Sequence, residues 1–167
     1  IKAKNTRRLA LADLNWTRLL PFRLAIAQCF DAPECLPALG KIDSVRVAHN
    51  PESASTARLL TCWMAVQLGW TPSNWSGNQI CFHQAGREIQ AGFEPVATGS
   101  ASGIAEIALN AEDLTISIKQ SEGANLLTAA LRGKLIEREM SFSSAPAQLV
   151  ELLSCEMNPS ARHKIYQ

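Results

Sequence analysis

Two cysteines, Cys29 and Cys35, stand six residues apart in a segment that also holds Asp31 and Pro33. Asp and Pro favour chain reversals, and a reversal here would bring the two Cα atoms within the roughly 4.4–6.8 Å that a disulfide requires. Closing so short a loop would add only about 2 kcal/mol of stability, so the bond would serve as a redox switch rather than as a staple. Two unlinked thiols, Cys29 in the core and Cys35 in a loop, are the alternative.

A second group of reactive side chains consists of His49, Cys81 and His83. Cys81 and His83 are two residues apart in an expected strand, so their side chains would share one face of a sheet. A zinc site needs further ligands, which no second Cys-x-x-Cys or His pair supplies. A cysteine in a strand is most often a small buried hydrophobe rather than a nucleophile. We therefore expect no metal and no cofactor.

The sequence lacks the short motifs of common catalytic sites. Neither the nucleophile elbow nor the phosphate-binding loop occurs. The nearest glycine-rich stretch is "ATGSASG", Ala97–Gly103, which has no Lys-Ser/Thr ending and precedes no expected helix. It predicts a connection between strands.

Binding chemistry is better represented, near the start of the chain. Trp16, Arg18, Phe22 and Arg23 combine aromatic area with guanidinium groups, the composition favoured at binding hot spots. A proline suits the first turn of a helix, and the apolar spacing that follows predicts a helix over Pro21–Phe30. In the alternative, which composition alone favours, the two aromatic side chains fill the core and the arginines bind carbonyls or acids.

A second candidate interface surrounds Trp70 and Trp75, which flank "TPSN". We expect this stretch to be a loop, and tryptophans in a loop are less easily explained by packing alone.

The first half of the chain predicts a strand, a helix and a strand. Val45 and Val47 alternate with other residues in a strand over Ser44–His49, and a helix capped by Asn50 or Ser53 then runs to Gly69. The next expected strand is Gln79–Gln84. This order and length suit a right-handed crossover between two parallel strands.

From Arg87 onward the hydrophobic period is two, with turn signals between the segments. We expect five strands here, "REIQAGFE", "GIAEIALN", "LTISIK", "NLLTAAL" and "LIEREMSF", and a closing helix, "SAPAQLVELLSCEM", capped by Ser143 or Ser144. The predicted fold class is α+β: a mixed β-sheet, with one βαβ unit followed by an antiparallel meander, and helices packed on one face. We expect a linker or arm at 1–12, one domain at 13–158 and a polar tail at 159–167.

The composition is that of an ordinary globular domain. The chain has 167 residues, 47% of them hydrophobic, and a formal net charge of +1. The small charge argues against a nucleic-acid partner, whose binding needs many Lys and Arg contacts to phosphates. No apolar run approaches the roughly 20 residues that cross a bilayer, so we expect no membrane association. The odd number of cysteines predicts a reducing compartment, the cytoplasm.

The run "DLNWTRLLPFRLAIAQCFD" resembles a hallmark of the glucose-6-phosphate dehydrogenase assembly proteins, the OpcA family. In that family an Asp-Leu-x-Trp-x-Arg-Leu-x-Pro-Trp/Phe-Arg stretch opens the C-terminal domain. The matching positions are Asp13, Leu14, Trp16, Arg18, Leu19, Pro21, Phe22 and Arg23. "LLTCWMAVQLGW" is similar to the family's helix ending in Leu-Gly-Trp, and the segment "SFSSAPAQLVELLSCEM" and the Arg-x-x-x-Tyr-x tail are similar to its last elements. Phe22 stands where Trp is commoner in the family.

The resemblance implies a non-enzymatic C-terminal domain that binds glucose-6-phosphate dehydrogenase and promotes its assembly or activated state. In cyanobacterial members this activity is linked to redox control of the oxidative pentose phosphate pathway. Cys29 and Cys35 are the candidates for that link, and thioredoxin is a further candidate partner.

A different class of function stays open as the alternative. In it the chain is a small-ligand sensor or enzyme, whose site lies at the carboxyl ends of two parallel strands near His49, Asn50 and His83. A deep polar pocket around the two histidines would favour this second hypothesis.

Overall fold

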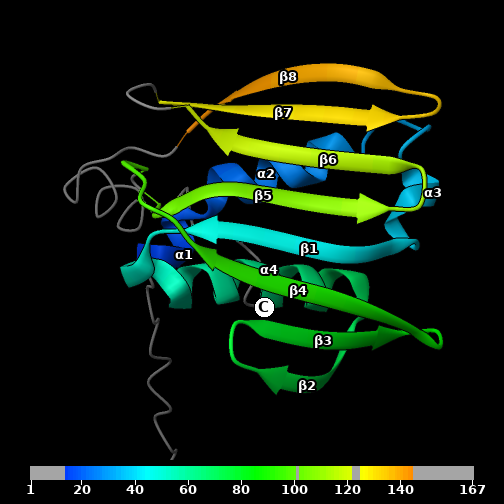
Figure 1. The fold of residues 1–167 in the computed structure, drawn as a ribbon. Helices are drawn as coiled ribbons and strands as arrows, with labels where there is room; N and C mark the ends of the chain where they lie inside the picture. The colour runs from blue at the N-terminus through cyan, green and yellow to red at the C-terminus, as the bar shows by residue number, and fades with distance from the viewer. Residues whose placement is uncertain (1–13, 101, 122–124, 145–167) are drawn as a thin grey trace, which may run out of the picture.

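An eight-stranded sheet with helices on one side makes up the described part of the chain, residues 14–100, 102–121 and 125–144 of a computed structural model (Figure 1). The expected arm at 1–12, the closing helix and the tail at 159–167 lie outside these residues. The elements in chain order are α1 (Leu14–Arg18), α2 (Leu20–Cys29), α3 (Leu36–Leu39), β1 (Ile42–His49), a 3₁₀ turn (Pro51–Ser53), α4 (Ala54–Leu68), β2 (Thr71–Ser76), β3 (Gln79–Gln84), β4 (Arg87–Pro95), β5 (Ile104–Ala111), β6 (Leu114–Gln120), β7 (Leu126–Gly133) and β8 (Glu137–Ser143).

The α+β class and every strand expected from an alternating pattern are confirmed. Alternation works here because one face of the sheet is covered and the other is open to solvent. In β1, Val45 and Val47 are buried while Arg46 between them is exposed. The helix expected over Pro21–Phe30 is α2, shifted by one residue at each end.

The strand order, β2-β3-β4-β1-β5-β6-β7-β8, corrects the expected crossover. The parallel neighbour of β1 is β4, with Val45 opposite Ala91, rather than Gln79–Gln84. That segment is β3, which pairs antiparallel with β4. The chain therefore leaves β1, passes through α4 and the β2–β3 hairpin, and only then returns beside β1. The expected meander began at Arg87, but the run of successive antiparallel neighbours begins at β5.

Helix α4 leads directly into an edge strand that the sequence did not predict. Gly69 ends the helix in the left-handed conformation, with φ of +69°, which glycine adopts at no steric cost. Trp70 then donates its backbone N–H to Ala65 O at 2.8 Å. The stretch expected as a loop, "TPSN", lies in β2, and all six residues of β2 are exposed.

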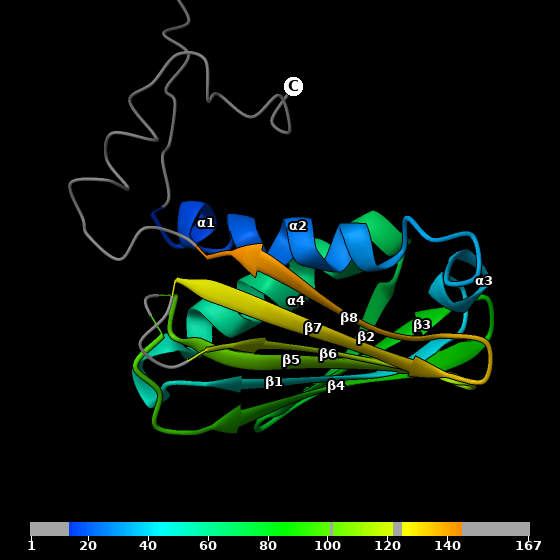
Figure 2. The ribbon, with the colours of Figure 1, turned by 90° about the horizontal axis from the view of Figure 1, so that it is seen from above.

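The core lies between the sheet and the helices. Helix α2 packs on β6, β7 and β8, and α4 packs on β1 and β4. Figure 2 shows α1, α2 and α4 on the same side of the sheet. Fully buried side chains from both layers include Leu19, Phe22, Leu60, Met64, Ile89, Ile107, Leu109, Ile116, Ile118 and Leu127. Within the described ranges, no helix is both long and apolar enough to span a bilayer.

The uncovered face of the sheet carries a row of charges across four strands. Arg46 on β1 pairs with Glu94 on β4 at 2.9 Å and with Glu106 on β5 at 3.2 Å. On β6, Ser117 donates to Glu106 at 2.7 Å and Lys119 lies 3.6 Å from it. Partial burial alone would raise the pKa of Glu106, but the Ser117 hydrogen bond and the two cations outweigh it and lower that pKa. The two cations and two carboxylates of this row therefore balance one another on a face that is open to solvent.

Gly103→Ala should destabilise the fold by about 2 kcal/mol or more. Gly103 has φ of +73°, and an added Cβ would lie 2.0 Å from Ser53 Oγ, at the start of α4. A positive φ alone costs an alanine about 1–2 kcal/mol, and the clash adds to that. Gly99→Ala is the matched control, because no atom lies within 4 Å of its added Cβ. Thermal unfolding of both variants tests this, and equal melting temperatures would contradict it.

Candidate functional site

A buried guanidinium joins the helices that carry the aromatic residues. The Arg23 guanidinium carbon lies 3.5 Å from the centroid of the Trp16 ring and 6.0 Å from that of Trp63. Arg23 Nη2 also donates to Trp16 O at 3.0 Å. Arg23 is only 3% exposed, and cation–π contacts are strongest in such desolvated settings. Arg23 thereby connects α1, α2 and α4.

The first candidate interface is largely inside the molecule. Trp16 is 8% and Phe22 is 1% exposed. Arg18 is half-buried, and its Nη1 donates to Asn15 Oδ1 at 3.4 Å. The aromatic side chains thus fill the interior and Arg23 binds a carbonyl, as in the alternative stated for this segment. A direct role of these residues in partner binding stays a prediction.

The two tryptophans of the second candidate interface differ in exposure. Trp70 is buried and packs against Phe82, with ring centroids 5.8 Å apart. Trp75 is 58% exposed, and the Arg58 guanidinium carbon lies 5.1 Å from its ring centroid. Arg58 also lies 5.9 Å from the Phe93 ring. Sequence reasoning missed Arg58, although it is the only Lys, Arg, Asp or Glu between positions 54 and 86.

Cys29 and Cys35 are both fully buried free thiols. Burial, with a smaller effect of the nearby Cys35 thiol, raises the pKa of Cys29 to about 12. The pKa of Cys35 is also raised, by burial and by Glu34, while Arg138 opposes the rise. The thiolate is the reactive form of cysteine, so neither residue exchanges readily in this conformation. A Cys29–Cys35 switch and a thioredoxin partner both stay predictions.

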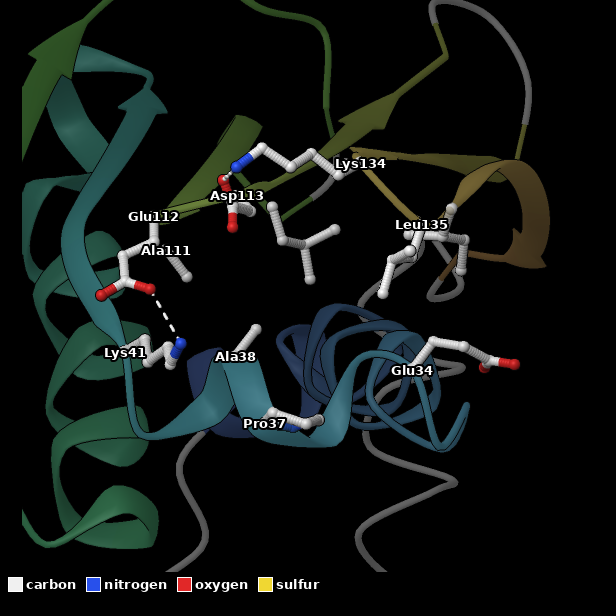
Figure 3. Close-up of a pocket in the computed structure, with 12 residues that line it drawn as sticks. Glu34, Pro37, Ala38, Lys41, Ala111, Glu112, Asp113, Lys134 and Leu135 are labelled. Atoms are coloured by element: carbon white, nitrogen blue, oxygen red, sulfur yellow. Dashed lines mark hydrogen bonds and ion pairs between the residues drawn. The ribbon is translucent and has the colours of Figure 1, made fainter.

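A surface cavity of about 330 Å³ lies where α3 meets the β5–β6 and β7–β8 turns (Figure 3). Its lining residues are Glu34, Pro37, Ala38, Lys41, Ala111, Glu112, Asp113, Leu114, Gly133, Lys134, Leu135 and Ile136. Two ion pairs stand on its rim: Lys41 with Glu112 at 2.8 Å, and Lys134 with Asp113 at 2.5 Å. These four side chains are at least half exposed, and such pairs add little stability.

The cavity suits an apolar side chain better than it suits catalysis. Its described titratable groups are on the exposed rim, and Leu135 beside them is 86% exposed. None of the residues expected to bind a partner lines it, although Glu34 precedes Cys35 in the chain. The sequence predicted the turns that line the cavity but not the cavity itself. A cavity formed by segments far apart in the chain leaves no pattern in any one of them.

The alternative ligand site at the strand ends is wrong as stated. His49 is opposite Pro95 at the end of β4, whereas His83 is opposite Glu88 at its start. These positions are seven residues apart along β4, or roughly 23 Å at the usual rise per residue. His49 is also buried, with Nδ1 2.6 Å from Asn50 O. The strand of His83 is antiparallel to β4, so no shared carboxyl edge brings the two histidines together.

The architecture is that of an α+β domain with one open sheet face, and comparison with known proteins assigns it further. Residues 9–167 match the family described as the C-terminal domain of the glucose-6-phosphate dehydrogenase subunit. The chain belongs to this family. The resemblance read from the Trp16–Arg23 segment is thereby confirmed.

Curated relatives from cyanobacteria are named OxPP cycle protein OpcA. The one from Synechocystis sp. is 39% identical over 67 residues, which is 40% of this chain and 14% of that protein. The one from Nostoc punctiforme is 37% identical over 62 residues, 37% of this chain and 13% of that protein. The chain matches only a small part of the length of these relatives.

Arg23→Met should lower the free energy of unfolding by about 2 kcal/mol or more. The substitution keeps the apolar stem but removes the cation–π contacts and the charged donor to Trp16 O, each of which contributes on that order when buried. Arg18→Met, at a half-buried site, should cost less than about 1 kcal/mol. Denaturant unfolding followed by tryptophan fluorescence measures both, and equal losses would contradict the role given to Arg23.

Alkylation of the native protein should be slow at Cys29 and fast at the exposed Cys62. With a pKa of about 12, the Cys29 thiolate is scarce at pH 8, and its labelling rate should rise about tenfold per pH unit up to pH 10. Peptide mass spectrometry resolves the sites, and unfolded protein serves as the control in which both react at similar rates. Native Cys29 reacting as fast as Cys62 would be the contrary result.

Proposed function

We propose that this chain is a non-catalytic domain that binds glucose-6-phosphate dehydrogenase and promotes its assembly or active state. The observation that carries the proposal is the family match over residues 9–167. The names of the relatives refer to the OxPP cycle and support a role for this chain in that cycle. A cytoplasmic location stays a prediction.

An activator of this kind acts by differential affinity. It must bind the active form of the enzyme more tightly than the inactive form, because equal affinity shifts no equilibrium. A tenfold shift requires about 1.4 kcal/mol, which one well-buried aromatic contact can contribute.

We divide the predicted binding residues by their exposure. Trp75 presents most of its side chain to solvent and is the direct contact. Trp16, Phe22, Arg23 and Trp70 are buried, so they act by positioning the helices and the edge strand rather than by touching the enzyme. Arg18 is half-buried and remains a second candidate for direct contact.

Redox control through Cys29 and Cys35 is the finer part of the proposal. Both thiols are buried, so disulfide formation first requires the Asp31–Glu34 connection to open. Closing the bond releases two electrons and two protons, which an oxidised disulfide of a partner such as thioredoxin would accept. The resulting bond would tie the end of α2 to Cys35 at the start of α3, whose Pro37 and Ala38 line the cavity in Figure 3.

A binding and activity assay with the cognate dehydrogenase tests the proposal. The protein should form a complex with the enzyme and change its kinetics by several-fold, and should leave an unrelated NADP-dependent dehydrogenase unaffected. Under oxidising and reducing conditions the effect should differ for wild type but not for Cys35→Ser. If no complex forms and the kinetics do not change, the proposed function is wrong; a redox response retained by Cys35→Ser would remove only the switch.

A further inference from the structure

The surface formed by α4 and β2 is almost free of charge. Between Ala54 and Gly86 the chain has one Lys, Arg, Asp or Glu, which is Arg58. At the chain average of 19% charged residues, such a stretch would carry about six. Charged residues normally make up about a quarter to a third of an exposed surface, and their depletion is typical of the centre of a protein interface.

This depletion does not reflect burial. On α4, Arg58, Cys62 and Val66 are four residues apart and therefore share one face. Cys62 is exposed and Val66 is 77% exposed. All six residues of β2 are exposed, including Trp75. We call Arg58, Cys62, Val66 and the strand β2 the α4–β2 surface.

The edge of the sheet at β2 is also less protected than the edge at β8. Charged side chains guard edge strands against pairing with other chains. Three of the seven residues of β8 are charged, namely Glu137, Arg138 and Glu139, whereas β2 has none. Pro72 has no backbone N–H to donate, and the register of β2 is irregular between Pro72 and Asn74, so the first half of β2 pairs poorly with a further strand. Asn74–Ser76 is the part of the edge that can accept one.

Among the residues that the structure describes, Arg58 forms no ion pair with an acidic side chain. Its guanidinium carbon lies 5.1 Å from the centroid of the Trp75 ring and 5.9 Å from that of the Phe93 ring. Its Nε atom is buried without a hydrogen bond, and none of the ion pairs among the described residues includes it. A single cation on an otherwise uncharged surface is complementary to a carboxylate surrounded by apolar and polar uncharged groups.

We propose that an extended segment of glucose-6-phosphate dehydrogenase docks on the α4–β2 surface. Its backbone pairs with Asn74–Ser76 and a carboxylate binds Arg58. One apolar side chain packs on Trp75, and another packs on Val66, which lies about 12 Å from Arg58 along α4. Addition of a strand to a free sheet edge is a common mode of peptide recognition. The inference rests on the proposed function, to which it adds the docking surface and the chemistry of the docked segment.

Charge favours this occupant over a second copy of the chain. In a two-fold dimer the same surface meets itself. Each Arg58 would then face a surface whose only formal charge is the other Arg58, and neither would gain a carboxylate.

Three variants and one control test the surface by measuring the dissociation constant for the dehydrogenase. Trp75→Ala, Arg58→Gln and Asn74→Pro should each weaken binding at least tenfold. Arg58→Gln should also reduce the salt dependence of binding, because it removes the charge pair. Arg132→Gln, an exposed cation on β7, is the matched control and should bind within twofold of wild type. Circular dichroism and the melting temperature establish that each variant is folded.

The outcomes separate the inference from the proposed function. If wild type does not bind the dehydrogenase, the proposed function fails and the docking surface with it. If wild type binds, and folded Trp75→Ala and Arg58→Gln bind within twofold of it, the α4–β2 surface is wrong and the proposed function stands. Sedimentation gives the third outcome: a wild-type dimer that these two variants dissociate, with dehydrogenase binding unchanged, would assign the surface to self-association and overturn the inference.

Discussion

The Arg23 guanidinium, which lies over the Trp16 ring and within 6.0 Å of the Trp63 ring centroid, is the polar contact that the three helices share. A charge that is 3% exposed loses nearly all of its hydration, which costs several kcal/mol unless other groups replace the water. The Trp16 ring, the Trp63 ring and the Trp16 carbonyl do so here. Because these groups belong to α1 and α4 while Arg23 belongs to α2, one desolvated cation links three helices.

The same constraint reaches the surface through α4. Trp63 contacts Arg23 in the interior, and Arg58, five residues earlier on the same helix, contacts Trp75 on the edge strand. The left-handed turn at Gly69 and the Trp70 N–H bond to Ala65 then fix where β2 begins. The buried cation and the exposed aromatic residue are therefore both in contact with α4, through Trp63 and Arg58.

The strands could be predicted from the sequence because a half-covered sheet imposes a period of two on buried side chains. The pairing of the strands within the sheet could not be predicted. Alternation shows which residues of a strand face the core, but it does not show which other strand lies beside it. Gln79–Gln84 was therefore correctly predicted as a strand, but its predicted pairing with β1 was wrong, because it pairs with β4. Thr71–Ser76 was missed because all of it is exposed, so it has no alternation to detect.

The candidate binding residues show a similar limit. Tryptophan and arginine are enriched at hot spots, but they are equally suited to a buried cation–π stack, and composition does not distinguish Trp16 from Trp75. Depletion of charge is also ambiguous alone, because a buried helix has it too. It points to an interface here only because Val66 and Trp75 are largely exposed within the same uncharged stretch. Exposure, which depends on the tertiary fold, thus decides between a core and a docking surface.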